Sequence, residues 1–297
     1  GTQGEGARVP GQAEREDDGP AWGDMPVPPL DLLTEDPSKR QQYTTDPLLR
    51  EGWATLAGVL GAGAALRFAS ETAIAWLRPD AAAAGAIAEV AGRIDAEGFV
   101  AVGAAVVQLG RADVRALWWW QLKRATAERL LLLDAVAALG PSLVVLYRHA
   151  DGDPALCLTR LKGSNDPAGR AQDSLRSVAG SPNRLLTMVH TSDDPADVVR
   201  ELAVFLPWRE RAALVASAWA CGSPASSSTV LGRPLAAVRS AYAGQAGDGV
   251  PVKAPRRRGE AFAALLGDIA VPEVTRRWPA VAQWSRQVPL LAGGQSR

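Results

Sequence analysis

The 297-residue sequence contains only two cysteines and two histidines, and its formal net charge is zero. The two cysteines, Cys157 and Cys221, lack the spacing of metal ligands and do not suggest a disulfide framework, so a reducing, cytoplasmic setting is expected. The 32 basic and 32 acidic residues cancel. No strong attraction to nucleic acid or to a membrane surface follows from that balance.

Long hydrophobic runs are also missing. The apolar stretch at residues 53–65 is short and broken by glycines, so it cannot span a bilayer. The first residues are polar and Gly-rich, without the apolar core of a signal peptide. Within the apolar stretch, residues 61–64 resemble a glycine-rich turn but lack the strand and the lysine of a phosphate-binding loop. We therefore expect no membrane partner.

Composition divides the chain into three parts. Residues 1–45 contain few large apolar side chains, so we expect this segment to be mostly disordered. Residues 46–208 carry regular apolar patterns and open with a helix, for which Asp46 is the N-cap and Pro47 lies in the first turn. Residues 209–297 form a C-terminal extension. Its expected helices span residues 209–219, 261–269 and 272–287, with a Ser-rich loop at 223–228 and a flexible basic stretch at 244–259.

In the central part, short apolar strands alternate with helices. The expected strands span residues 72–77, 99–109, 143–147 and 185–190. The expected helices span residues 81–96, 113–121, 126–139 and 154–161, and one more follows residue 190. A polar loop is expected between residues 162 and 184. This order predicts an α+β fold, a ferredoxin-like βαββαβ sandwich with extra terminal helices.

His190 is one of only two histidines, and it stands at the end of the last predicted strand. The polar residues 191–195 open the next helix, so the imidazole lies beside free backbone N–H groups and the positive end of a helix dipole. Such a place favours an anionic ligand such as phosphate. Glu201, eleven positions further on, can fold back to hold the ring. His149 is expected to be an ordinary loop residue.

Several motifs, in their order and spacing, resemble the nucleoside diphosphate kinase family over about residues 71–208. The family's Lys-Pro-Asp, which precedes a helix, corresponds to Arg78-Pro79-Asp80, and its Gly-Phe corresponds to Gly98-Phe99. Its Ser-Gly-Pro, Gly-x-Thr-Asn-Pro, Thr-Ile-Arg and Asn-x-x-His-Gly-Ser-Asp motifs correspond to residues 139–141, 163–167, 174–176 and 187–193. The glutamate that orients the family's histidine corresponds to Glu201.

The resemblance implies ping-pong phosphoryl transfer between nucleoside triphosphates and diphosphates through a phosphohistidine. It makes His190 the nucleophile, Glu201 the group that holds its ring, and Ser192 a support for that contact. The implied phosphate and nucleotide contacts are Arg78, Arg160, Asn165, Arg176, Thr187 and Trp119. Mg²⁺ is the implied cofactor, with Asp193 as a nearby carboxylate. The partner is a nucleotide or another phosphorylated small molecule.

The resemblance also implies a homo-oligomer, although the additions at both ends of the chain can alter that assembly. The richness in Ala, Gly, Arg and Trp, with few Lys, is typical of a high-GC bacterial proteome, and an actinobacterial source is the closest match to it.

Departures from the family leave two alternatives open. Arg78 replaces the lysine, which is not a conservative change at a phosphate. Thr187 replaces an asparagine, the alanines at 81–84 replace an arginine, and one of Trp118–Trp120 replaces a tyrosine. Three consecutive tryptophans on a helix cannot all face one core. The chain is then either a non-catalytic regulatory or scaffold module, or a repurposed enzyme in which His190 and Glu201 form an acid–base pair.

Overall fold

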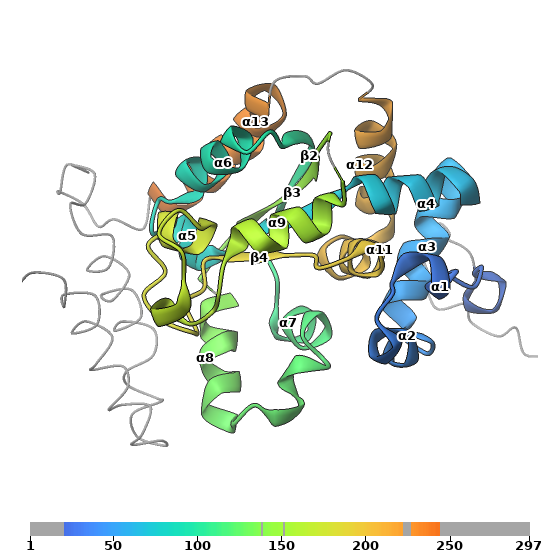
Figure 1. Cartoon of the computed structure of the whole chain (residues 1–297), viewed down its shortest axis with the longest axis horizontal. Coiled ribbons are helices and arrows are strands. Elements are labelled where there is room, and N and C mark those ends of the chain that lie inside the picture. The colour runs from blue at the N-terminus through green and yellow to red at the C-terminus, as the bar shows by residue number, and fades with distance from the viewer. Residues whose placement is uncertain (1–20, 138, 151, 222–226, 244–297) are drawn as a thin grey trace, which may run out of the picture.

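A four-stranded antiparallel sheet lies at the centre of the molecule (Figure 1). The computed structural model describes residues 21–137, 139–150, 152–221 and 227–243. The strands are β1 (Ala73–Leu77), β2 (Val100–Val107), β3 (Ser142–Arg148) and β4 (Val189–Thr191). Their order is β2-β3-β1-β4, with α6 (Ile87–Ala96) between β1 and β2 and α9 (Pro154–Lys162) between β3 and β4. This is the predicted βαββαβ arrangement, and the fold prediction is confirmed.

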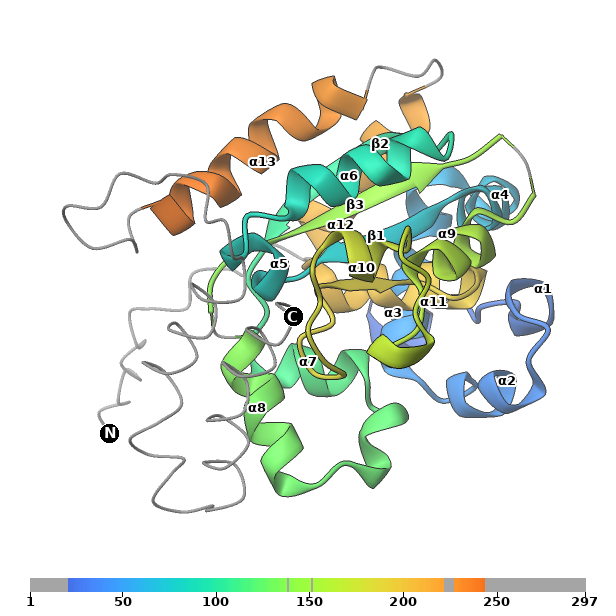
Figure 2. The same ribbon diagram turned by 60° about the vertical axis from the view of Figure 1, so that its left-hand side comes forward.

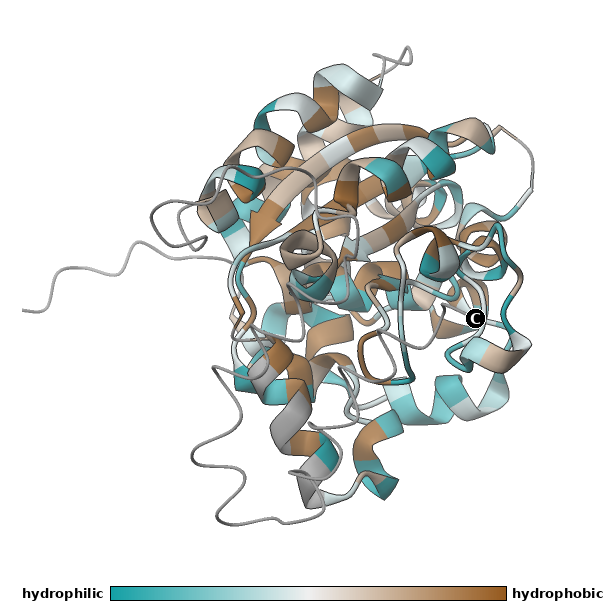
Figure 3. Ribbon diagram, turned by 90° about the vertical axis from the view of Figure 1, so that its left-hand side faces the viewer, coloured by the Kyte–Doolittle hydropathy of each residue, from teal (hydrophilic) through white to brown (hydrophobic). Residues whose placement is uncertain are grey.

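The two central strands form the core because they are apolar on both faces. Every residue of β1 is buried, and so are all but the last of β3. Figure 3 shows hydrophobic residues along the sheet and on the helices that face it. In the register of the sheet, Trp76 on β1 pairs with Val144 on one side and with His190 on the other. The sheet thus fixes His190 beside the most buried strand.

The helix predicted for residues 81–96 is two helices, α5 (Pro79–Ala83) and α6. Gly85 adopts a left-handed conformation (φ 67°) and ends the first of them. The N–H of Ala86 bonds back to the Ala81 carbonyl, as in a helix C-cap. Because alanines surround this glycine, the spacing of apolar residues does not reveal that the helix is interrupted there.

The last strand is shorter than predicted, because residues 185–188 are not extended strand. Met188 has a positive φ of 63°, which is rare for a residue with a side chain. The carboxylate of Asp80 accepts a hydrogen bond from the Met188 N–H at 3.0 Å, and the Arg78 N–H donates to the Met188 carbonyl at 3.0 Å. The chain therefore turns around the end of β1 before it enters β4.

Residues 21–45 are not disordered, contrary to the prediction for residues 1–45. They contain a short 3-10 helix (Trp22–Asp24) and the helices α1 (Leu30–Leu33) and α2 (Pro37–Tyr43). Leu33 and Tyr43 are buried. Composition does not predict this order, because a few polar side chains, rather than a broad apolar face, anchor the segment. Residues 1–20 lie outside the described part of the chain.

The α3 helix (Pro47–Leu60) begins as predicted, with the Asp46 carboxylate accepting hydrogen bonds from the N–H groups of Leu48 and Leu49. It packs against α11 (Pro195–Phe205), which also contacts α4 (Ala62–Glu71) and α7 (Arg111–Leu117). After α7 the chain continues through a 3-10 helix (Gln121–Arg124) into α8 (Ala127–Ala137), and both lie below the sheet in Figure 1.

Two C-terminal helices cover β2, as Figure 2 shows for α13 (Ser227–Ala243). The other is α12 (Trp208–Ala220), near the predicted 209–219. The sequence pattern does not predict α13, which holds Pro234 in its interior and begins inside the expected Ser-rich loop. The helices expected at residues 261–269 and 272–287 and the basic stretch at 244–259 lie outside the described residues. Within the described ranges, no helix has both the length and the apolar character needed to cross a membrane.

Candidate active site

His190 and Glu201 form a hydrogen-bonded pair between β4 and α11. The imidazole Nε2 lies 2.7 Å from the Glu201 Oε1, and the two side chains are 15% and 7% exposed. Burial raises the pKa of Glu201 above its usual value, while the nearby imidazole acts in the opposite direction. The second carboxylate oxygen, Oε2, is buried and accepts no hydrogen bond from the described residues. The pair matches the predicted contact between the ring and the glutamate.

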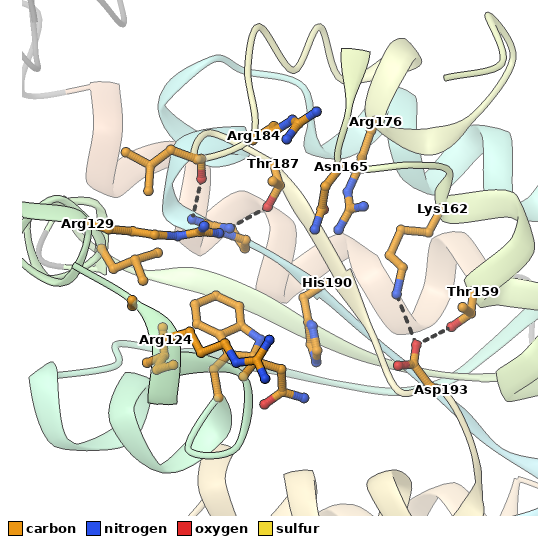
Figure 4. Close-up of a pocket in the computed structure, with 17 residues that line it drawn as sticks. Arg124, Arg129, Thr159, Lys162, Asn165, Arg176, Arg184, Thr187, His190 and Asp193 are labelled. Carbon is orange, nitrogen blue, oxygen red and sulfur yellow. Dashed lines mark hydrogen bonds and ion pairs between the residues drawn. The ribbon is translucent and has the colours of Figure 1, made fainter. Parts of the chain in front are cut away.

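A pocket of about 490 Å³ opens in front of His190 (Figure 4). Among the described residues that line it, cations greatly outnumber carboxylates, because Asp193 is the single acidic side chain. The cations are Arg78, Arg124, Arg129, Lys162, Arg176 and Arg184. They come from the junction of β1 and α5, α8 and its preceding segment, α9, α10 (Leu175–Val178) and the loop before β4. Such a cavity is suited to a multiply charged anion.

The buried cations of the pocket repel one another, and this repulsion disfavours their protonated forms. Burial, with the charges of Arg78 and Arg170, lowers the pKa of Arg176 to about 10. The Arg176 guanidinium donates to the carbonyls of Gly163 (2.7 Å) and Val189 (3.2 Å), while its Nε has no partner among the described residues. Burial also lowers the pKa of Lys162. An anion bound between these groups would relieve the repulsion.

Arg78, which follows the last residue of β1, is almost completely buried. Its guanidinium donates to the Thr187 hydroxyl and to the Leu185 carbonyl, and its Nε lies 3.1 Å from the Asp80 carboxylate. It also lies over the Trp118 ring, 5.4 Å from the centroid. Arg78 therefore faces the pocket with part of its hydrogen-bonding capacity already used.

The three consecutive tryptophans do separate, and the one at the pocket is Trp118, not Trp119. The Trp118 ring lies edge-on to His190 at a centroid distance of 5.8 Å. Trp119 is 57% exposed and, with Trp120, lines a different cavity of about 320 Å³ next to the start of α3. Trp119, the residue named in the prediction, therefore does not line the pocket in front of His190, because α7 ends at Leu117 and the chain turns there.

Asn165, Thr187 and Asp193 lie at the pocket, as the resemblance implies for them. The Asp193 carboxylate lies 3.2 Å from the Lys162 Nζ and accepts a hydrogen bond from the Thr159 hydroxyl at 2.9 Å. Burial tends to raise the pKa of Asp193, but Lys162 and His190 outweigh it, so the pKa is lowered. Asp193 is therefore ionised at neutral pH.

Two predicted site residues, Arg160 and Ser192, do not make the contacts that were expected of them. Arg160 is exposed on α9 and is not among the residues that line the pocket; Lys162, half a turn later, lines it instead. Ser192 is fully buried, and its hydroxyl accepts a hydrogen bond from the Ile74 N–H at 3.0 Å. Ser192 thus extends the pairing of β4 with β1 and is occupied there, rather than with Glu201.

Four of the pocket cations, Arg124, Arg129, Lys162 and Arg184, are not among the predicted site residues. Arg184 forms an ion pair with Asp166, and Arg124 and Arg129 approach from the opposite side to Lys162 and Arg176 (Figure 4). Lys162 could have been found, because it directly precedes the Gly163-Ser164-Asn165 loop. The other three lie outside the quoted motifs, so only the tertiary structure brings them to His190.

The donor set suits a Mg²⁺ ion that arrives with its substrate. The described residues contain no group of three or more His, Cys, Asp or Glu side chains able to hold a metal ion by themselves. Magnesium is typically held by one or two carboxylates together with substrate phosphates. Asp193 supplies one ionised carboxylate at the pocket, so the residues present fit a phosphate-bound ion.

Residues 71–211 match the family model described as nucleoside diphosphate kinase. The similar solved structures include the enzyme from Aquifex aeolicus, with 20% identity and a TM-score of 0.39, covering 45% of this chain and 93% of that one. A nucleoside diphosphate kinase from Halobacterium salinarum, in complex with CDP, has 20% identity and a TM-score of 0.39, covering 46% and 88%.

A third structure, from Borrelia burgdorferi with bound vanadate and ADP, has 15% identity and a TM-score of 0.38, covering 46% and 86%. The search of curated proteins found no match. With the four-stranded sheet, the family-model match identifies residues 71–211 as a nucleoside diphosphate kinase-like domain, which this chain carries between additional segments at both ends.

Proposed function

We propose that this protein is a nucleotide-binding phosphotransferase in which His190 accepts a phosphoryl group. The single observation that carries the proposal is the His190–Glu201 pair, with 2.7 Å between Nε2 and Oε1, at the wall of a pocket lined by six cationic side chains. Phosphoryl transfer needs a positioned nucleophile and positive charge around the transferring group. Both are present within one cavity.

The hydrogen bond to Glu201 selects the reactive nitrogen. A carboxylate that accepts the Nε2–H leaves the other ring nitrogen, Nδ1, unprotonated and with a free lone pair. Nδ1 attacks the γ-phosphorus of a nucleoside triphosphate, the bond from that phosphorus to the bridging oxygen breaks, and the nucleoside diphosphate leaves. Glu201 stabilises the positive charge that the ring gains. An acceptor diphosphate reverses these steps and regenerates the free imidazole.

The cations hold the phosphates while these bonds change. Lys162 and Arg176 approach from α9 and α10, and Arg124 and Arg129 approach from the other side of the cavity. A Mg²⁺ ion on the phosphates would neutralise further charge, with Asp193 as its protein carboxylate. Trp118 offers an aromatic surface at the same pocket. The Mg²⁺ requirement, the homo-oligomer and the cytoplasmic location remain predictions.

Labelling with γ-³²P-ATP and Mg²⁺ tests the proposal. We expect acid-labile label on the wild type and on His149→Ala, and none on His190→Ala, because the chain has only these two histidines. The label should pass to an added nucleoside diphosphate. Absence of label on the wild type with every common nucleoside triphosphate, or label that survives in His190→Ala, contradicts the proposal.

A second candidate, a nucleotide-binding module without transfer, is favoured by one observation. Arg78 is engaged with Asp80, Thr187 and Leu185 and is therefore less free than a lysine to follow a moving phosphate. In that case ADP binds, as measured by calorimetry, with equal affinity to wild type and His190→Ala, and no label is taken up.

A further inference from the structure

The segment between His190 and Glu201 is held from outside the kinase-like domain. Asp194 is the N-cap of α11, and its Oδ1 accepts the Asp197 N–H at 3.0 Å. The Asp197 Oδ2 in turn accepts the N–H of Asp193 at 3.2 Å. These two carboxylates therefore shape the turn that joins the histidine to its glutamate.

Three side chains of the N-terminal segment reach these carboxylates. The Lys39 Nζ lies 2.7 Å from the Asp194 Oδ2 and 2.8 Å from the Asp197 Oδ2. The Tyr43 hydroxyl donates to the Asp197 Oδ1 at 2.6 Å, and the Thr34 hydroxyl donates to the Asp194 Oδ2 at 2.6 Å. All three residues lie before residue 71, where the family match begins.

Asp197 also lies one helical turn before Glu201, so the two carboxylates share a face of α11. Burial raises the pKa of Asp197, and the charge of Asp197 adds to the effects that raise the pKa of Glu201. Lys39 opposes this, because its cation lies against Asp197. The charges of Asp194 and Asp197 hold the pKa of Lys39 above its usual value, although burial acts the other way.

We infer that Lys39 and Tyr43 are positioning residues for the His190–Glu201 pair, so that the N-terminal helix α2 is part of the phosphotransfer unit. Lys39 compensates the carboxylate next to Glu201 and fixes the turn after His190, and Tyr43 fixes the rotamer of Asp197. The effect of these residues on phosphotransfer rests on the proposed function, whereas the effect of Lys39 on the imidazole of His190 does not depend on it.

Other charges also act on His190, and they stay constant in the comparison of variants. The charged groups that face it are Glu201 from α11, Asp193 from the turn before α11, Lys162 from α9, Arg176 from α10, Arg78 from the end of β1 and Arg124 from the 3-10 helix after α7.

Variants of the full chain test the inference. In Lys39→Met, the phosphorylation rate of His190 should fall by about 10-fold or more through misplacement of the pair. The dissociation constant for ADP should stay unchanged, since Lys39 is not among the residues that line the pocket. Lys39→Arg should restore most of the rate. If Lys39→Met only lost its fold, the phosphorylation rate and the affinity for ADP would fall together, and the positive charge of Lys39→Arg would not restore the rate.

Tyr43→Phe removes one hydroxyl while it keeps the packing, so it remains informative if Lys39→Met fails to fold. It should lower the rate in the same direction. Its matched control is Tyr242→Phe, because the Tyr242 hydroxyl donates to the Pro141 carbonyl at 2.9 Å and not to α11. The control should leave the rate unchanged.

NMR of the histidine rings separates this inference from the proposed function. Loss of the Lys39 side chain frees the turn after His190, so the ring resonances of His190 should shift while those of His149 stay unchanged. A wild type that takes no label sinks the proposed function, and the ring resonances of His190 still decide the inference. Equal rates and unchanged His190 resonances in Lys39→Met and Tyr43→Phe overturn it.

Discussion

At the scale of single residues, the site contains ionisable side chains whose charged forms are disfavoured by burial. Glu201 is a buried carboxylate with one oxygen on His190 and the other without a partner among the described residues. Arg176 and Lys162 are buried cations whose pKa values are lowered. Functional sites often keep such perturbed groups at a cost in stability.

Glu201→Gln should separate activity from stability. The raised pKa of Glu201 means that the folded state favours its protonated form, so its contribution to stability is lost as pH rises through that pKa. The glutamine cannot ionise. As the pH rises above the ordinary pKa of a glutamate, the free energy of unfolding of the variant should therefore rise relative to that of the wild type.

The same variant should phosphorylate His190 on the order of 10²-fold more slowly, because a neutral amide does not stabilise the charged ring. Urea unfolding at several pH values and single-turnover labelling measure the two effects. Glu210→Gln, at an exposed position on α12, serves as the control. A variant that keeps the wild-type rate, or that loses stability steadily as pH rises, contradicts this account of Glu201.

At the scale of elements, the site depends on the crossing of α3 and α11, since α11 carries Glu201. Gly52 lies at that crossing, where a Cβ atom would stand 2.0 Å from the carbonyl oxygen of Val199. Backbone cannot yield as a flexible side chain can. The glycine is therefore required by close approach, within a helix that otherwise follows its sequence pattern.

Gly52→Ala should destabilise the protein by about 1–3 kcal/mol through overpacking and should slow phosphorylation as α11 shifts. Gly58→Ala, on the same helix with nothing within 4 Å of the new Cβ, should stabilise it by about 0.5–1 kcal/mol, the difference in helix propensity. Thermal unfolding of both variants checks this. Equal shifts would mean that the crossing is looser than the structure shows.

At the scale of the whole molecule, the sequence predicts the sheet well because its strands are continuous apolar runs bounded by turn residues. It places His190 and Glu201 correctly because both lie within one short stretch of chain. It misses α13, whose internal Pro234 argues against a helix, and α2, whose attachment to α11 needs Lys39 and Tyr43 to meet residues more than 150 positions away.

The pocket shows the same limit. Arg78, Asn165 and Thr187 belong to local motifs, and motif spacing brings them to the cavity. Arg124 and Arg129 come from α8 and the segment before it, where no motif marks them. The turn after Leu117 decides that Trp118, and not Trp119, faces His190. Local patterns cannot fix such a choice between adjacent residues, because the outcome depends on where a helix ends.

The central claim is that Glu201 holds the Nε2 of His190 and leaves Nδ1 to accept phosphate within the full chain. ³¹P NMR of the intact phosphoprotein, formed with Mg²⁺ and ATP and compared with isomer standards, tests it most directly. We predict the Nδ1-linked phosphohistidine as the dominant species, with its signal absent from His190→Ala. A signal from the Nε2-linked isomer, or phosphate on any other side chain, would contradict the account.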